Sequence, residues 1–185
     1  MLRITGGHLK NRRLTVPGAI RPTQEKVRQA LFNILGSFIE EARVLDGYAG
    51  SGALGFEALS RGAAFVAFVE SDTGAVLSIR ENLERLADDV PRSAWRLVHL
   101  DAVQGIRELA GSEPPFDVVL LDPPYRTDEA KKALNALIEC AMVSPHGLVA
   151  VEHPRSTVLP TVIGQLHQRT QHRYGDTVLS FYQPS

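Results

Sequence analysis

The spacing of apolar residues changes along this chain, and the change outlines a fold. Short apolar runs that suit buried strands alternate with stretches in which apolar residues recur at helical spacing. Strands are predicted at 43–46, 65–70, 96–100, 117–122 and 148–152, and helices at 24–41, 53–61, 73–88, 102–110 and 128–142. Such alternation is typical of an α/β fold, a mostly parallel sheet with helices on both faces.

The two ends of the chain follow another pattern. Residues 166–174 and 177–182 flank Gly175-Asp176, which predicts an antiparallel hairpin at one edge of the sheet. Residues 2–5 and 8–16 flank Gly6-Gly7, which predicts a small β-hairpin near the N-terminus. We therefore expect two parts, a hairpin extension at 1–20 and a main domain at 21–185.

Composition narrows the class of protein. A chain of 185 residues with 44% hydrophobic content suits one compact domain with a real core. With one cysteine, Cys140, no intrachain disulfide is possible, and no apolar run reaches the length of a membrane span. The histidines are scattered without metal-ligand spacing. These features predict a cytoplasmic protein that binds neither a membrane nor a metal.

The net charge of −1 hides an asymmetry. Residues 1–30 carry seven Arg and Lys side chains but only one acid, Glu25, so this segment has a net charge of +6. The basic charge is therefore concentrated at one end of the chain, where a polyanion could bind. A solvated positive face without a partner is the alternative.

The strand predicted at 117–122 ends in Asp122-Pro123-Pro124-Tyr125. This tetrapeptide combines a carboxylate acceptor, a rigid backbone with its carbonyls, and an aromatic face. These groups suit a planar amino group on a base that has been moved out of a nucleic acid stack. We therefore interpret these four residues as the catalytic site of an enzyme that acts on a base.

A glycine-rich segment follows the first strand of the main domain. It comprises Asp46, Gly47, Tyr48, Ala49, Gly50, Ser51 and Gly52, and Gly55 completes a G-x-G-x-x-G pattern. Glycines let the chain turn sharply and let a ligand approach the backbone. The pattern also occurs in dinucleotide sites, but Asp46 would repel phosphate and suits a cationic amino group or sulfonium. A purely structural strand-to-helix turn is the other alternative.

Two further strand ends carry acids. Glu70 has a spacing from the glycines that suits an acceptor for ribose hydroxyls, with Ser71 beside it. Asp101 and the backbone of Ala102 could bind an adenine amino edge. Each acid could instead cap or precede a helix. Because ligands of doubly wound sheets bind beyond the carboxyl ends of the strands, we expect these acids to line one nucleoside-shaped cleft.

These residues resemble a known family, the RsmD-type 16S ribosomal RNA guanine-N2-methyltransferases among the class I S-adenosylmethionine-dependent methyltransferases. The resemblance covers nearly the whole chain. It is carried by Arg3-Ile-Thr-Gly-Gly7, Arg21-Pro-Thr23, 27–33, 46–62, Glu70 and 122–125. It implies a Rossmann-like fold with a seven-stranded, mostly parallel sheet, an antiparallel C-terminal strand and an N-terminal hairpin extension.

The resemblance also implies a function. The cofactor would be S-adenosylmethionine, and the partner would be 16S ribosomal RNA in an assembling or assembled small subunit, bound by a monomeric enzyme. Asp122 and the Pro123 carbonyl would accept hydrogen bonds from the guanine amino group, while Tyr125 stacks on the base. The residues expected to bind RNA are Arg3, Lys10, Arg12, Arg13, Arg21, Thr23 and Arg28.

Other functions share parts of this pattern. Tyr125 also occurs at this position in DNA adenine-N6 enzymes, whereas the family often has Phe. A DNA adenine-N6 or protein amino-methyltransferase is therefore an alternative. A nicotinamide-dependent oxidoreductase and a non-catalytic RNA-binding module are further ones.

Overall fold

The computed structural model of this chain describes residues 2–16, 22–125 and 128–185. Within these ranges the main sheet has eight strands in the order β5-β4-β3-β6-β7-β10-β9-β8. The strands are β3 (Arg43–Asp46), β4 (Phe65–Glu70), β5 (Trp95–His99), β6 (Phe116–Leu121), β7 (Val143–Pro154), β8 (Val162–Ile163), β9 (Leu166–Tyr174) and β10 (Thr177–Pro184). The first five strands in this order, β5, β4, β3, β6 and β7, are parallel to one another. The remaining three, β10, β9 and β8, each pair antiparallel with their neighbours.

The α/β class and the C-terminal hairpin are confirmed by this sheet. It has one strand more than the seven expected, because the two-residue strand β8 pairs with β9 at the edge. A strand of two residues leaves no alternation for sequence analysis to detect.

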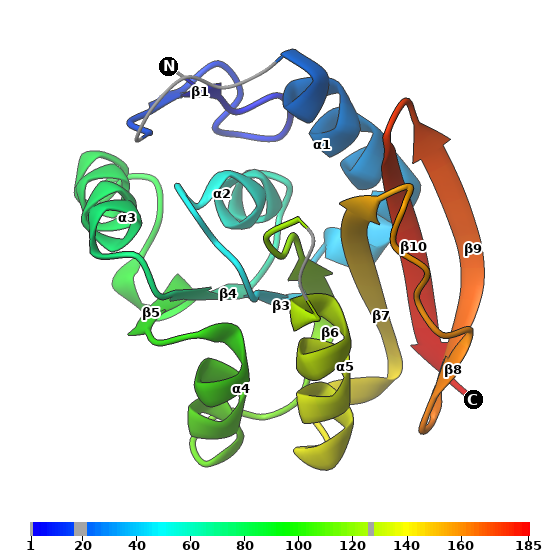
Figure 1. The fold of residues 1–185 in the computed structure, drawn as a ribbon. Helices are drawn as coiled ribbons and strands as arrows, with labels where there is room; N and C mark the ends of the chain where they lie inside the picture. The colour runs from blue at the N-terminus through cyan, green and yellow to red at the C-terminus, as the bar shows by residue number, and fades with distance from the viewer. Residues whose placement is uncertain (1, 17–21, 126–127) are drawn as a thin grey trace.

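Helices cover both faces of the sheet (Figure 1). Helices α1, α2 and α3 lie on one face, and α4 and α5 lie on the other. The helices are α1 (Pro22–Leu35), α2 (Ala53–Ser60), α3 (Thr73–Arg85), α4 (Ala102–Ala110) and α5 (Glu129–Glu139), with short 3-10 helices η1 (Gly36–Ile39) and η2 (Arg92–Ala94). The helix predicted at 24–41 ends early as an α-helix, because Gly36 adopts a left-handed φ of 49°.

Two apolar cores fill the space between the sheet and its two helical layers. One contains Phe56 of α2, Ile79 of α3 and Phe68 of β4, all fully buried. The other contains Ile106 of α4 and Leu134 of α5. Alternate residues of the strands serve the two cores, as Val44 and Leu45 do. This packing fixes the strand ends that form the site.

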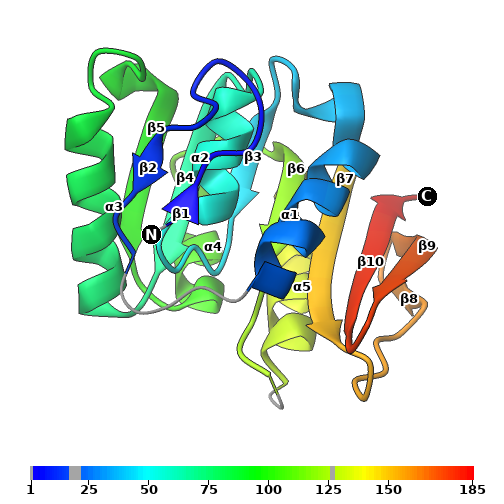
Figure 2. The ribbon, with the colours of Figure 1, turned by 90° about the horizontal axis from the view of Figure 1, so that it is seen from above.

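The N-terminal segment is more than a hairpin. Strands β1 (Leu2–Arg3) and β2 (Arg13–Leu14) pair antiparallel but have only two residues each. The intervening loop lies over α2, and β1 and β2 lie above the gap between α2 and α3 (Figures 1 and 2). Leu2, Ile4, Leu9 and Leu14 are buried in the same core as α1, α2 and α3. The segment therefore packs onto the main domain instead of standing apart from it.

The turn predicted at Gly6-Gly7 is a docking point. Gly7 has a φ of 75°, and a Cβ atom there would lie 1.7 Å from the carbonyl oxygen of Ser60. Only glycine allows this approach, since both the left-handed backbone and the contact exclude a side chain.

Among the described helices, none is long and apolar enough to cross a membrane.

Candidate active site

Four carboxylates come together at one end of the sheet. Asp46 ends β3 and Glu70 ends β4, while Asp122 follows β6 and Glu152 lies near the end of β7. Two adjoining pockets open there. We call them the Glu70 pocket and the Glu152 pocket after a carboxylate that lines each one. Tyr48, Gly50 and Asp122 line both, so the two pockets meet at these residues.

The Glu70 pocket contains most of the residues predicted to bind the cofactor. The following residues line it: Gly47, Tyr48, Gly50, Val69, Glu70, Ser71, Leu100, Asp101, Ala102, Asp122, Pro124 and Glu129. A Cβ atom on Gly50, whose φ is 53°, would have no other atom within 4 Å, so this backbone borders open space. The glycine therefore leaves room for a ligand to lie against the main chain.

Glu70 is held firmly at the rim of its pocket. One carboxylate oxygen accepts a hydrogen bond from the Gly50 amide at 2.6 Å, and the other accepts from the amides of Ser71 and Asp72. The helix α3 is capped by Asp72 and not by Glu70. Asp101 caps α4 by accepting a hydrogen bond from the Gln104 amide, which agrees with the alternative of a helix-capping role. It also lines the pocket.

Asp46 lies completely buried under the glycine-rich segment. Its Oδ2 atom accepts a hydrogen bond from the Gly55 amide at 2.9 Å, but Oδ1 has no partner among the described residues. The pKa of this carboxyl is raised to about 7, chiefly by burial; the Gly55 hydrogen bond opposes the rise, and the nearby Asp122 and Glu70 add to it. An unpartnered carboxylate atom next to three other acids fits a cationic ligand.

The remaining glycine-rich residues have separate roles. Ala49 and Ser51 line the Glu152 pocket. Gly52 lines neither pocket. It precedes α2 with a φ of 80°, and a Cβ there would lie 2.6 Å from the Phe56 ring. Gly52 therefore has a structural role in the strand-to-helix turn, which is the alternative that the sequence allows for the whole glycine-rich segment.

Asp122 and Glu152 form a pair in the wall of the second pocket, which the following residues line: Leu2, Gln24, Arg28, Tyr48, Ala49, Gly50, Ser51, Ala53, Leu54, Asp122 and Glu152. Burial raises the pKa of Asp122, and burial together with the neighbouring Asp122 raises the pKa of Glu152. Two carboxylates this close hold a proton more tightly than either would alone.

The rest of the predicted catalytic tetrapeptide lies at the pocket rim. Pro123 is buried, whereas Pro124 lines the Glu70 pocket. Tyr125 is 46% exposed, and its hydroxyl lies 3.4 Å from Thr177 Oγ1 of β10. The Tyr125 ring lines neither pocket, so stacking on a base stays a prediction.

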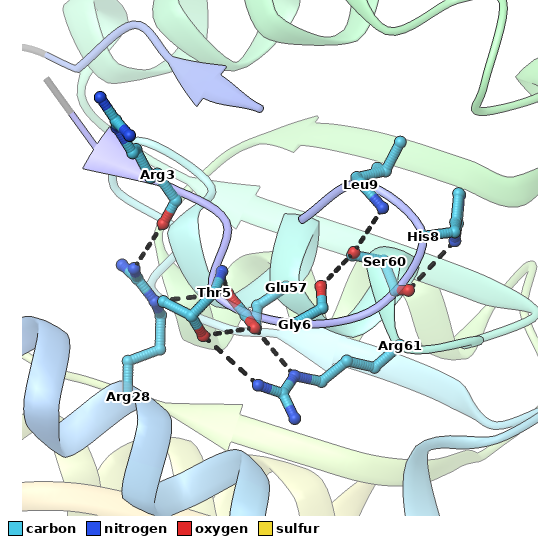
Figure 3. Close-up of polar contacts among 9 residues, drawn as sticks. All are labelled: Arg3, Thr5, Gly6, His8, Leu9, Arg28, Glu57, Ser60 and Arg61. Carbon is cyan, nitrogen blue, oxygen red and sulfur yellow. Dashed lines mark hydrogen bonds and ion pairs between the residues drawn. The ribbon is translucent and has the colours of Figure 1, made fainter. Parts of the chain in front are cut away.

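Polar contacts attach the N-terminal segment to α2 (Figure 3). Glu57 is fully buried, and its carboxylate accepts hydrogen bonds from the amide and hydroxyl of Thr5 and from Arg61 Nε. Ser60 accepts a hydrogen bond from the His8 amide with its carbonyl and one from the Leu9 amide with its hydroxyl. The same segment carries Leu2, which lines the Glu152 pocket.

Residues predicted to bind RNA occupy different environments. Arg3, Lys10 and Arg13 are exposed on the N-terminal segment. Arg12 is exposed as well but forms an ion pair with Asp89. Arg21 lies outside the described residues, as does the side chain of Thr23.

Arg28 is the exception among these residues, because it is only 5% exposed. It donates a hydrogen bond to the Arg3 carbonyl and lies 3.6 Å from Glu57. Arg28 also lines the Glu152 pocket, so it belongs to the pocket wall and not to the outer basic face. Charge counting could not separate these two positions.

Two features of the site are not predicted from the sequence. Glu152 is the last residue of a predicted strand, so its position at a strand end is the signal that could have identified it, as it identifies Asp122. Glu57 and Ser60 lie within a predicted helix, where nothing in the sequence marks them as partners of residues about fifty positions earlier.

Comparisons with known proteins identify the family of this chain. The family model described as Conserved hypothetical protein 95 matches residues 2–183. Ribosomal RNA small subunit methyltransferase D of Escherichia coli K12 is 34% identical over 184 residues, covering 98% of this chain and 89% of that protein. Its counterpart in Haemophilus influenzae is 35% identical over 162 residues, covering 86% of this chain and 82% of that protein.

A solved structure extends the likeness. Escherichia coli yhhF, described as a candidate methyltransferase, has a TM-score of 0.86 and 33% identity, and the match covers 100% of this chain and 98% of that one. The chain therefore belongs to the family described as Conserved hypothetical protein 95, the family of ribosomal RNA small subunit methyltransferase D.

Proposed function

We propose that this protein transfers a methyl group from S-adenosylmethionine to the exocyclic N2 atom of a guanine in small-subunit ribosomal RNA. The observation that carries the proposal is the position of Asp122, which lines both pockets where they meet. A group that must act between a cofactor and a base has to lie at such a junction. The family supports a ribosomal RNA as the molecule that carries the base.

The residues of the Glu70 pocket fit the cofactor. Glu70 offers acceptors for ribose hydroxyls, Asp101 and the Ala102 amide suit an adenine edge, and Gly50 leaves room along the backbone. The buried and unpartnered Oδ1 of Asp46 supplies negative charge for the cationic end of the cofactor. When bound, S-adenosylmethionine supplies an electrophilic methyl group on a sulfonium.

Asp122 and the Pro123 carbonyl do the positioning in this proposal. The guanine amino nitrogen is a poor nucleophile, because its lone pair is delocalised into the ring. Two acceptors that bind its hydrogens favour a pyramidal nitrogen with the lone pair directed at the methyl group. Asp122 then stabilises the positive charge that develops on nitrogen and accepts the released proton.

The exposed basic residues of the N-terminal segment are proposed to bind RNA phosphates. Arg3, Lys10 and Arg13 are exposed on the same N-terminal segment whose Leu2 lines the Glu152 pocket. Such contacts supply affinity and orientation but little choice of sequence. We expect the enzyme to work as a monomer in the cytoplasm, since the RNA supplies the large docking surface.

A labelling experiment tests the function directly. Purified protein is incubated with methyl-labelled S-adenosylmethionine and small ribosomal subunits that lack the modification, and the RNA is digested to nucleosides for mass spectrometry. Label in N2-methylguanosine is the expected result. Label in N6-methyladenosine of a parallel DNA substrate, in a protein, or in no product would contradict the proposal.

Removing charge from the N-terminal segment should weaken RNA binding. Arg13→Ala is expected to lower affinity several-fold and to reduce the slope of log affinity against log salt by about one. Arg12→Ala should have the smaller effect, because the Arg12 guanidinium is already paired with Asp89. Filter binding at several salt concentrations measures both. Equal salt slopes for the wild type and Arg13→Ala would remove this segment from the RNA interface.

A further inference from the structure

Glu152 lies beside Asp122, and the mechanism above gives it no role. The residues that precede the two acids, Leu121 and Val151, are register partners on the adjacent parallel strands β6 and β7. Adjacent strands lie about 4.8 Å apart. Both acids line the same pocket, and Asp122 contributes to the raised pKa of Glu152.

The Glu152 carboxyl has no structural partner that would explain it. The part of the chain that the structure describes offers it no hydrogen bond and no ion pair, although it is half-buried. The acids used for structure in this protein look different, since Glu57 accepts three hydrogen bonds and Asp117 accepts two. An acid with little exposure and no partner is costly unless a ligand supplies one.

Guanine presents a matching edge. Its Watson–Crick edge carries the N2 amino group and, directly next to it, the N1–H group, and both are donors. When the amino group is bound to Asp122, the N1–H group needs an acceptor to one side of Asp122. Glu152 is in such a position, because it lies on the strand next to the one that Asp122 follows. Adenine differs, because the atom next to its amino group is an acceptor.

We propose that Glu152 determines base specificity by accepting the N1–H hydrogen bond of the target guanine. This inference rests on the proposed function and names the residue that distinguishes guanine from adenine in the same pocket. The raised pKa values of Asp122 and Glu152 do not prevent this role. A proton on either carboxyl relieves the repulsion between the two and leaves a Glu152 oxygen free to accept.

The test is a cycle of two enzymes and two bases. Wild type and Glu152→Ala are assayed on reconstituted small subunits that carry either guanine or 2-aminopurine at the target position. 2-Aminopurine keeps the amino group that receives the methyl but lacks the N1 hydrogen. We expect Glu152→Ala to reduce kcat/KM on guanine by roughly 10- to 100-fold and to change kcat/KM on 2-aminopurine by less than about 3-fold.

Conservative and control variants make the cycle selective. Glu152→Gln keeps an amide oxygen as acceptor and should stay within about 5-fold of wild type on guanine. Glu139→Ala removes an exposed acid on α5 and should behave as wild type. Cofactor affinity and the melting temperature of each variant show whether the fold is intact.

The outcomes separate this inference from the proposed function. Equal losses on both bases for Glu152→Ala would overturn the specificity role, and so would a larger loss on 2-aminopurine, because Glu152 would then donate instead of accept. Wild type that methylates no guanine at all would overturn the proposed function itself.

Discussion

Asp122→Ala is expected to lower the rate of methyl transfer by about 10³-fold while the affinity for S-adenosylmethionine changes little. The variant loses the acceptor that orients the amino group and takes its proton, and loss of one such preorganised group costs about 10²- to 10³-fold. The substitution leaves unchanged the residues proposed to bind the cofactor, which include Glu70, Asp101 and the backbone of Gly50. The two quantities therefore separate chemistry from binding.

Single-turnover assays with labelled cofactor measure the rate, and calorimetry measures the affinity. Asp122→Asn keeps one acceptor oxygen and should fall between wild type and Asp122→Ala. Asp88→Ala, which removes an exposed acid beyond α3, is the matched control. Full activity of Asp122→Ala would refute the mechanism and would favour an RNA-binding protein without catalysis.

Asp46→Asn is expected to abolish detectable cofactor binding and yet stabilise the protein at alkaline pH. Asp46 has a folded-state pKa of about 7 against an ordinary value of 3.8, mainly because it is buried. The folded state then binds the proton more tightly than the unfolded state does. The contribution of Asp46 to the free energy of unfolding therefore falls as pH rises from about 4 to about 7.

Asparagine at this position does not ionise, so the variant avoids the loss of stability that comes from ionising the buried Asp46, although the buried amide lacks a full set of hydrogen-bond partners. The expected gain is of the order of 1 to 2 kcal/mol above pH 8, with little gain below pH 4. Urea unfolding at several pH values measures it, and Asp101→Asn at the exposed cap of α4 is the control. A variant as pH-sensitive as the wild type would show that Asp46 does not titrate as proposed.

The fold was largely predictable because helical and strand spacing alternate cleanly. The strands at 43–46 and 65–70 and the helix at 102–110 agree in both boundaries with β3, β4 and α4. Strand ends were informative as well, since parallel strands deliver their last residues to one edge. Asp46, Glu70 and Asp122 were identified in this way.

The parts that could not be predicted depend on contacts between distant segments. Gly6-Gly7 has the composition of a hairpin turn, but its position is set by Ser60 of α2. Arg28 has the charge of an RNA-binding residue, but packing of α1 against the N-terminal segment buries it. Such outcomes follow from tertiary packing and leave no local trace in the sequence.

The docking of the N-terminal segment on α2 has a thermodynamic consequence. Its loop is held by the buried Glu57 and by Ser60, so its backbone is ordered before any partner arrives. Binding through such a surface loses little conformational entropy, in contrast to a basic tail that folds on its target. Association with RNA should therefore show a small heat-capacity change, with the salt-dependent release of counterions dominating the free energy.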